Sequence, residues 1–194
     1  MNLFLRIIFV SHFAGLFLLG PAAAQDSPHA GIPLEPVTVN LDGRGYGLGY
    51  RRYPEPFAVK LSGPADNPDS AYGSAHGFWL ALATAADYDA VAAWTRDADL
   101  KSSARPSNEA AHMDTAHAIL AGGVLLYGEI VYGDYHIFIY RYPKSIPRNL
   151  GLPVRRFGNR YYVVPNLVDV DPLAGRMSAL RWDMDRLRAE HPAK

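Results

Sequence analysis

The chain has 194 residues, with 19 basic and 19 acidic side chains and no cysteine. The absence of cysteine excludes disulfide bonds, thiol catalysis and a lipid-modified N-terminal cysteine. The balanced charge gives no global field for nucleic acid or an anionic membrane, and the length suits one domain with a real core.

Residues 1–24 differ in character from the rest of the chain. Arg6 precedes an apolar run, residues 7–19, and small residues follow up to Ala24. This pattern predicts a secretory signal peptide with cleavage before Gln25, and therefore a periplasmic or secreted protein that is not a lipoprotein. A transmembrane anchor is the alternative, but the apolar run has about 13 residues against the roughly 20 that cross a bilayer. We therefore expect no stable membrane span after cleavage.

After cleavage we expect an extended, proline-rich leader, residues 25–36, and then a single α+β domain, residues 37–194. Within residues 37–53, apolar residues alternate on both sides of the turn pair Asp42-Gly43, which predicts a β-hairpin. Glycine occupies every second position from Gly43 to Gly49. No helix follows, which argues against a phosphate-binding loop. The glycines are expected to give the strand a bare face that another backbone, a bulky ring or a ligand approaches closely.

The core of the domain, residues 67–168, is expected to begin with three helices. Asn67 is expected to cap the first helix, with Pro68 in its first turn. A second, short helix follows Asp87, and a third opens at residues 107–109. All three carry apolar residues at spacings of three and four, which indicates one buried stripe on each helix.

From residue 124 onwards the chain becomes rich in β-branched and aromatic residues, which predicts a meander of about four antiparallel strands. The first two strands either join in a tight turn at Gly133 or bend there, and Gly158-Asn159 predicts a second hairpin. Both faces of these two strands are apolar, so we expect helices on one face and the C-terminal helix or a second subunit on the other. The expected grouping puts Val131, Ile137 and Ile139 on one face and Ile130, Phe138 and Tyr140 on the other.

The pair Asp171-Pro172 predicts the start of a C-terminal amphipathic helix, residues 171–190. Its apolar residues step by four and three and form one narrow seam: Leu173, Met177, Leu180, Met184 and Leu187. Such a seam indicates a partner surface, which is the protein's own sheet, a second copy in a homodimer or another envelope protein.

The order of these elements resembles the nuclear transport factor 2-like superfamily. The matching features are an aromatic-rich first helix, the break Ala86-Asp87-Tyr88, and a final hairpin with a basic and aromatic strand after Gly158-Asn159; they span residues 67–167. The resemblance implies a cone-shaped α+β fold in which a curved antiparallel sheet, here of about four to six strands, wraps around three helices. Its members include isomerases, dehydratases and cyclases as well as non-catalytic binding domains, so the fold does not decide the activity.

Asp134 and His136 are the strongest candidates for acid–base chemistry. On a continuous strand they share a face, and the carboxylate would orient the imidazole as a general base. The alternative, which the Gly-Asp pattern favours, places Asp134 in a turn. The chain contains no G-x-S-x-G, H-E-x-x-H or P-loop motif, so the common hydrolase and nucleotide signatures are absent.

The residue pattern predicts no metal site and no other cofactor. His112 and His117 lie about 140° apart around the third helix and do not converge. Glu109 and His112 share a face, but the matching motifs of a carboxylate-bridged site are missing from the other helices.

Tyrosine is frequent, with 12 residues, many in the expected strands. Tyrosine is a good strand former that can face both core and water, but exposed rings and arginines also form contact surfaces for sugars or peptides. The expected ligand-binding residues are Trp79, Tyr132, Phe138 and Tyr140. We expect an exported, non-catalytic accessory domain that binds a small apolar molecule, a glycan or a protein partner. The alternative is a cavity enzyme doing isomerase-, dehydratase- or cyclase-like chemistry on a small molecule.

Overall fold

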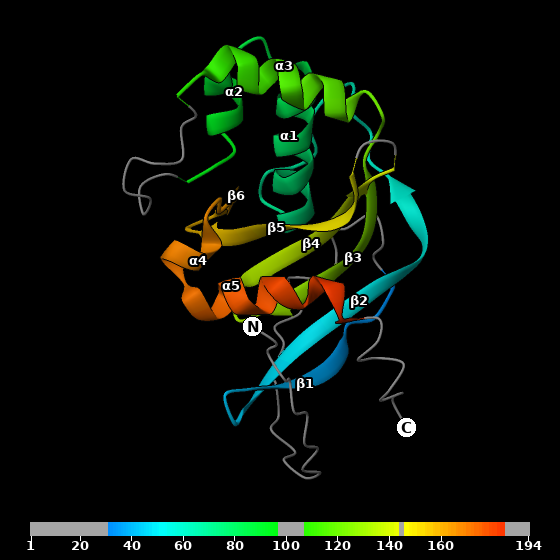
Figure 1. Ribbon diagram of the computed structural model, residues 1–194, viewed down its shortest axis with the longest axis vertical. Coiled ribbons are helices and arrows are strands. Elements are labelled where there is room, and N and C mark those ends of the chain that lie inside the picture. Colours follow the sequence, from blue (N-terminus) through cyan, green and yellow to red (C-terminus); the bar gives the residue numbers. More distant parts are fainter. Residues whose placement is uncertain (1–30, 97–106, 144–145, 185–194) are drawn as a thin grey trace.

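The computed structural model describes residues 31–96, 107–143 and 146–184. The expected signal peptide, residues 1–24, lies outside the described residues. A six-stranded sheet in the order β1-β2-β3-β4-β5-β6, with every neighbouring pair antiparallel, forms the centre of the fold. The sheet is curved and helices lie on both of its faces (Figure 1). The predicted α+β class, with a curved antiparallel sheet packed on helices, is therefore confirmed.

The N-terminal hairpin consists of β1 (Glu35–Leu41) and β2 (Arg44–Ala58). Asp42 and Gly43 between them have positive φ angles of 53° and 78°, the type I′ geometry that matches the twist of a two-residue hairpin. β2 also pairs with β3 (Leu125–Tyr132), so the hairpin belongs to the main sheet.

β2 continues beyond residue 53, where we expected the hairpin to end, as far as Ala58. Its pairing with β3 is interrupted between Arg52 and Phe57, and both Pro54 and Pro56 lie in that interruption. Because proline lacks the N–H that a ladder bond needs, this irregularity lets the strand pass through two prolines.

The glycines of β2 leave an open face, with side chains rather than backbone as neighbours. A Cβ at Gly45 would meet only the Thr38 methyl group, at 3.6 Å, and one at Gly49 would meet Leu34 at 3.4 Å. On the opposite face of the same strand, Leu48 is buried in the core.

Three helices lie on one side of the sheet: α1 (Ala71–Thr84), α2 (Tyr88–Ala92) and α3 (Glu109–Leu120) (Figure 1). Asp87 caps α2, accepting from the Ala90 N–H at 3.2 Å. No helix in the described ranges combines the length and apolarity that a bilayer span requires.

The cap of α1 differs from the prediction. Ser70, not Asn67, is the N-cap, and its hydroxyl oxygen accepts a hydrogen bond from the Gly73 N–H at 2.9 Å. The Asn67 side chain instead accepts from the Asp69 N–H at 2.9 Å, which makes a local turn before the helix. Because the Asn67 side-chain oxygen is bonded to the N–H two residues later, it does not cap the helix, and the N-cap lies at Ser70, three residues later than we expected.

The C-terminal half of the sheet is a meander of β3, β4 (Tyr135–Tyr142), β5 (Ile146–Phe157) and β6 (Arg160–Val163). The first two strands join in a tight turn rather than forming one bent strand, because Gly133 adopts a positive φ of 57°. The β5–β6 turn likewise contains Gly158, with a φ of 62°.

The chain's own C-terminal helices cover the second face of the sheet (Figure 1). They are α4 (Leu167–Val170) and α5 (Pro172–Ala179), and a short 3-10 turn, Leu180–Trp182, follows α5. Asp171 caps α5 as expected, accepting from the N–H groups of the next turn. The α-helix ends at Ala179, where the 3-10 turn begins, so the uninterrupted helix that we expected over residues 171–190 was wrong within the described part; residues after 184 lie outside it. Of the two coverings expected for this face, the structure therefore shows the C-terminal helix, which contacts β3 and β5.

The predicted grouping of side chains on the two faces was wrong for Ile130 and Val131. Because the turn at residues 133–134 has two residues, Ile130 pairs with Ile137 and Val131 pairs with His136. Directly paired residues share a face, so Ile130 lies towards α5. The core on that face contains Ile130, Ile137, Ile139, Met177 and Leu180. The core beneath α1 contains Tyr53, Tyr72, Trp79, Leu126, Phe138 and Tyr140.

Candidate functional site: the interior between α1 and the sheet

The structure separates the two predicted acid–base residues. Asp134 lies in the β3–β4 turn, 53% exposed, where its Oδ2 accepts from Arg155 Nε at 2.7 Å. His136 lies on β4 and is buried on the face towards α1. The Gly-Asp turn, one of the two alternatives read from the sequence, therefore holds Asp134, and a different carboxylate contacts the imidazole.

That carboxylate belongs to Glu129 on β3. Its Oε1 accepts from His136 Nδ1 at 2.7 Å, and its Oε2 lies 3.3 Å from Arg51 Nη1. Arg51 on β2 pairs directly with Glu129 across the two strands, so both side chains rise from the same sheet face. All three side chains are buried, with exposed residue fractions of 6% for Arg51, 4% for Glu129 and 9% for His136.

This arrangement fixes the orientation of the imidazole. An ionised carboxylate only accepts hydrogen bonds, so the Glu129 contact places a proton on Nδ1 and leaves Nε2 as the nitrogen that can exchange a proton. Active sites that use histidine as a general base often contain a buried carboxylate that orients the imidazole in this way. The ring also stacks near Phe138, at 6.5 Å between centroids, and meets Tyr161 edge to face at 5.6 Å.

Sequence reasoning missed Glu129 and Arg51, although Glu129 left a signal. It is the one acidic residue between Val124 and Tyr132, a run that is otherwise apolar or aromatic apart from a glycine. A carboxylate inside such a strand must be paired, because burying a single charge is costly. Arg51 left no comparable signal. It is followed directly by Arg52, and nothing in the sequence indicates which of the two arginines is buried.

Three of the four predicted ligand-binding residues meet in the same interior. Trp79 of α1 contacts Tyr140 edge to face, with 5.1 Å between ring centroids, and Phe138 lies 6.3 Å from Tyr140. Tyr132 lies at the end of β3 and packs, half-buried, against the core beneath α5. We call the first three, together with Arg51, Glu129 and His136, the interior site.

Within the described residues, three buried polar atoms of the interior site have no hydrogen-bond partner. They are Arg51 Nε, Trp79 Nε1 and the Tyr140 hydroxyl. Native interiors leave few such atoms, so each one indicates a bound water, a ligand or strain. Three such atoms lie in one interior, together with a buried histidine and its carboxylate. We therefore take this interior as the candidate site.

No family model, curated protein or solved structure matches the chain. The candidate site is therefore inferred from the geometry of the structure alone.

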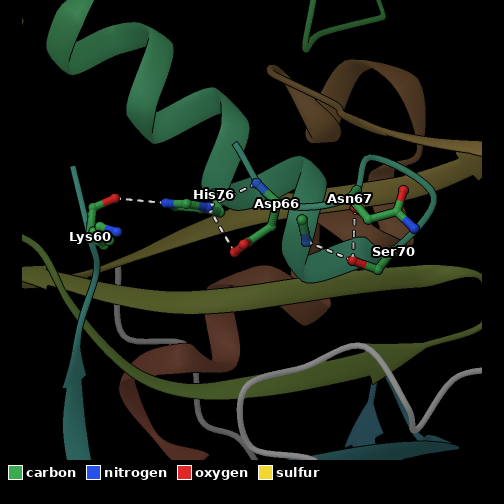
Figure 2. A network of polar contacts seen from close by, with 6 residues as sticks. Lys60, Asp66, Asn67, Ser70 and His76 are labelled. Atoms are coloured by element: carbon green, nitrogen blue, oxygen red, sulfur yellow. Dashed lines mark hydrogen bonds and ion pairs between the residues drawn. The ribbon is translucent and has the colours of Figure 1, made fainter. Parts of the chain in front are cut away.

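The start of α1 is held over the interior site by a polar network that sequence reasoning also missed (Figure 2). His76 Nε2 lies 2.7 Å from the Lys60 carbonyl oxygen, and Nδ1 lies 2.8 Å from the Asp66 carboxylate. The Ser70 cap completes the network through the Gly73 N–H. His76 thus ties the connection between β2 and α1 to the first turns of the helix, which fixes the position of α1 above the sheet.

No group of three or more histidine, cysteine, aspartate or glutamate side chains in the described part of the chain could hold a metal ion. His112 on α3 meets the ring of Tyr88 instead, edge to face at 5.8 Å.

Three tyrosines near the interior have strongly raised pKa values. Burial raises the pKa of Tyr72, Tyr140 and Tyr142, and for Tyr140 the hydroxyls of Tyr72 and Tyr53 add to this effect. The neighbouring Trp79 side chain acts on the Tyr140 pKa in the opposite direction and lowers it. In the unfolded chain these phenols ionise near pH 10, so the stability they give is complete below about pH 10 and is lost as the pH rises further.

We therefore expect Tyr142→Phe to change the response of stability to high pH. Above about pH 10 the free energy of unfolding should fall less steeply than in the wild type, by roughly 1.4 kcal/mol per pH unit, because one fewer phenol ionises on unfolding. Urea denaturation of both proteins across this pH range measures the two slopes. Equal slopes would show that Tyr142 ionises as readily in the folded protein as in the unfolded chain.

Proposed function

We propose that the chain is an exported, non-catalytic binding domain with a nuclear transport factor 2-like core, and that it holds a small molecule in the interior site. The observation that carries this proposal is the set of buried polar atoms without partners, Arg51 Nε, Trp79 Nε1 and the Tyr140 hydroxyl. Leaving such groups unpaired costs free energy, and a ligand that pairs them recovers it.

The chemistry of these atoms describes the ligand. A guanidinium N–H and an indole N–H only donate, and a phenol donates readily, so the ligand should present acceptor oxygens to them. The aromatic rings of Trp79, Phe138 and Tyr140 would contact its apolar part. A small, largely apolar molecule with a carbonyl or ether oxygen suits such a mixture of apolar walls and few polar groups.

Two sequence features support the remaining parts of the proposal. The charged start, the apolar run and the small residues before Gln25 are typical of export to the periplasm or the exterior. The order of three helices followed by an antiparallel meander resembles that of nuclear transport factor 2-like domains, and here β1 and β2 extend the sheet at the edge next to β3.

We test the binding site with Tyr140→Phe, and with Tyr46→Phe on the other face of the sheet as the matched control. The full chain, signal peptide included, is produced in its native envelope, and intact masses are compared under native and denaturing conditions. Wild type and Tyr46→Phe should retain the same small molecule. Tyr140→Phe should bind it about tenfold more weakly, because one hydrogen bond is lost.

The same variant also makes a prediction for the protein without ligand. Removing a buried hydroxyl that has no partner should leave the free energy of unfolding unchanged or raise it by about 1 kcal/mol. Chemical denaturation of the ligand-free proteins measures this change. A wild type that retains no molecule and loses stability on Tyr140→Phe would mean that ordered water occupies the site, and the proposal would be wrong.

A second candidate function is favoured by one contact, the 2.7 Å hydrogen bond between His136 Nδ1 and Glu129. With its imidazole oriented in this way, His136 would act as the general base of a cavity enzyme, with Glu129 in the role first given to Asp134. The native mass experiment separates the two functions through His136→Gln. A binding domain retains the same molecule as the wild type, whereas an enzyme whose base is lost retains its substrate instead of its product.

A further inference from the structure

A stripe of arginines and aromatic rings lies at the β6 end of the sheet. It consists of Arg96, Arg155 and Arg160 together with the rings of Trp94, Phe157 and Tyr162. We call it the guanidinium stripe. Strand pairing places Arg155 opposite Tyr162 and Phe157 opposite Arg160, so these four side chains share one face of the β5–β6 hairpin. In Figure 1 this hairpin and β1 lie at opposite ends of the sheet.

Each guanidinium of the stripe lies over a ring. The Arg96 guanidinium is 3.9 Å from the centre of the Phe157 ring, and Arg155 is 5.3 Å from the same ring. Arg160 lies 5.1 Å from Trp94 and 5.0 Å from Tyr162. These distances are those of cation–π contacts, which hold the planar guanidinium groups in place while leaving their N–H edges free to donate.

The positive charge of the stripe is only partly compensated. Arg155 pairs with Asp134, whereas no carboxylate in the described ranges lies within ion-pair distance of Arg96 or Arg160. Arg160 donates one long hydrogen bond, 3.4 Å, to the Ala93 carbonyl oxygen, and its Nε is buried without a partner. Arg96 and Arg160 are thus half-buried cations without a carboxylate partner among the described residues.

We propose that the guanidinium stripe binds an anionic oligosaccharide whose carboxylate groups pair with Arg96 and Arg160. The planar fork of arginine matches a carboxylate in a bidentate way, and sugar hydroxyls can pair with the remaining N–H donors. The stripe shares no residue with the interior site: Phe157 packs against the core beneath α5, and Trp94 packs against Gly77 of α1.

The structure favours a glycan over two other polyanions. Single-stranded nucleic acid binds by stacking its bases on open aromatic faces, and here guanidinium groups occupy ring faces. An acidic peptide is flexible and loses more conformational entropy on binding to rigid, fixed cations than a stiff sugar chain does.

The test uses a short oligogalacturonate as the probe and a neutral malto-oligosaccharide of equal length as its counterpart. Isothermal titration calorimetry on the full folded protein at low salt should detect the first and not the second. The double variant Arg96→Gln/Arg160→Gln should weaken binding at least about tenfold, because two charge-assisted contacts are lost. The matched control Arg44→Gln/Arg52→Gln removes two exposed arginines of β2 and should leave binding unchanged.

Arg96→Lys/Arg160→Lys keeps both charges but loses the planar forks, so its affinity should also fall. Circular dichroism spectra confirm that each variant is folded. Three results would overturn the proposal: no binding of the oligogalacturonate, equal weakening in the β2 control, or an unchanged affinity in the glutamine variant. Equal or tighter binding of poly-glutamate or single-stranded DNA would instead overturn the choice of a glycan.

Discussion

Replacing Glu129 by leucine is expected to lower the free energy of unfolding by about 3–5 kcal/mol. Glu129 is the shared partner of Arg51 and His136, and all three are buried. Without the carboxylate, the Arg51 guanidinium stays in the interior as an uncompensated charge, and His136 loses the acceptor of its Nδ1 proton. Urea denaturation of the wild type and the variant at neutral pH measures the difference.

Two controls separate the loss of the ion pair from the loss of volume. Arg51→Met/Glu129→Leu removes both charges, so it should recover at least about 2 kcal/mol of the loss, since apolar replacements of a buried ion pair are tolerated. Asp134→Asn breaks the exposed pair with Arg155 and should cost less than about 1 kcal/mol. A double variant as unstable as Glu129→Leu would contradict a charge-based explanation.

The free energy needed to bury the charges of Arg51 and Glu129 is relevant to the function of the interior. Apolar side chains in place of Arg51 and Glu129 would give an equally good or better core, because the desolvation of two charges offsets much of their attraction. Buried carboxylates that orient a histidine recur at functional sites. The cluster and the unpaired atoms of Trp79 and Tyr140 therefore point to the same interior by two independent routes.

Local sequence chemistry was sufficient for much of the fold. Asp42-Gly43 and Gly158 mark hairpin turns because glycine and aspartate accept the positive φ angles those turns need. Asp87 and Asp171 mark helix starts because a short acidic side chain accepts from the free N–H groups of the first turn. Each of these signals lies within a few residues of its effect, so a single sequence is enough to find it.

Strand register, in contrast, could not be read from local patterns. Ile130 and Val131 changed faces relative to the prediction because the position of a two-residue turn decides which residues pair. Arg51 meets Glu129 only because β2 pairs with β3, and three helices separate these strands in the chain. A contact that depends on such long-range pairing leaves no trace in the spacing of the residues.

The sequence predicted those parts of the candidate site that follow from the chemical type of a residue alone. Trp79, Phe138 and Tyr140 meet because aromatic residues gather in a core, whereas Tyr132 is just as aromatic and lies on the other face. His136 was found as the histidine in an apolar strand, but its carboxylate was assigned to Asp134, the nearest in sequence. Asp134 in the turn pairs with Arg155 instead, and the neighbouring strand β3 supplies Glu129.

The position of α1 over the interior site leads to the second prediction of large effect, Gly73→Ala. In an exposed helix this change stabilises by about 1 kcal/mol, because alanine is the better helix former. Here a Cβ at residue 73 would lie 1.8 Å from the carbonyl oxygen of Asn67. Because the obstacle is backbone, no rotamer change relieves it, and the helix must shift away from the turn that caps it.

We therefore expect Gly73→Ala to lower the free energy of unfolding by about 3 kcal/mol, opposite in sign to its helix propensity. The matched control is Gly45→Ala, where the new Cβ would meet only a methyl group at 3.6 Å, so stability should stay within about 0.5 kcal/mol. Urea denaturation compares both with the wild type. Because the Ser70 cap and the His76 contacts hold the same turn, Gly73→Ala should also weaken ligand retention by the interior site. A Gly73→Ala protein as stable as the wild type would show that α1 can move on the sheet, and the interior site would then lack the fixed wall that binding requires.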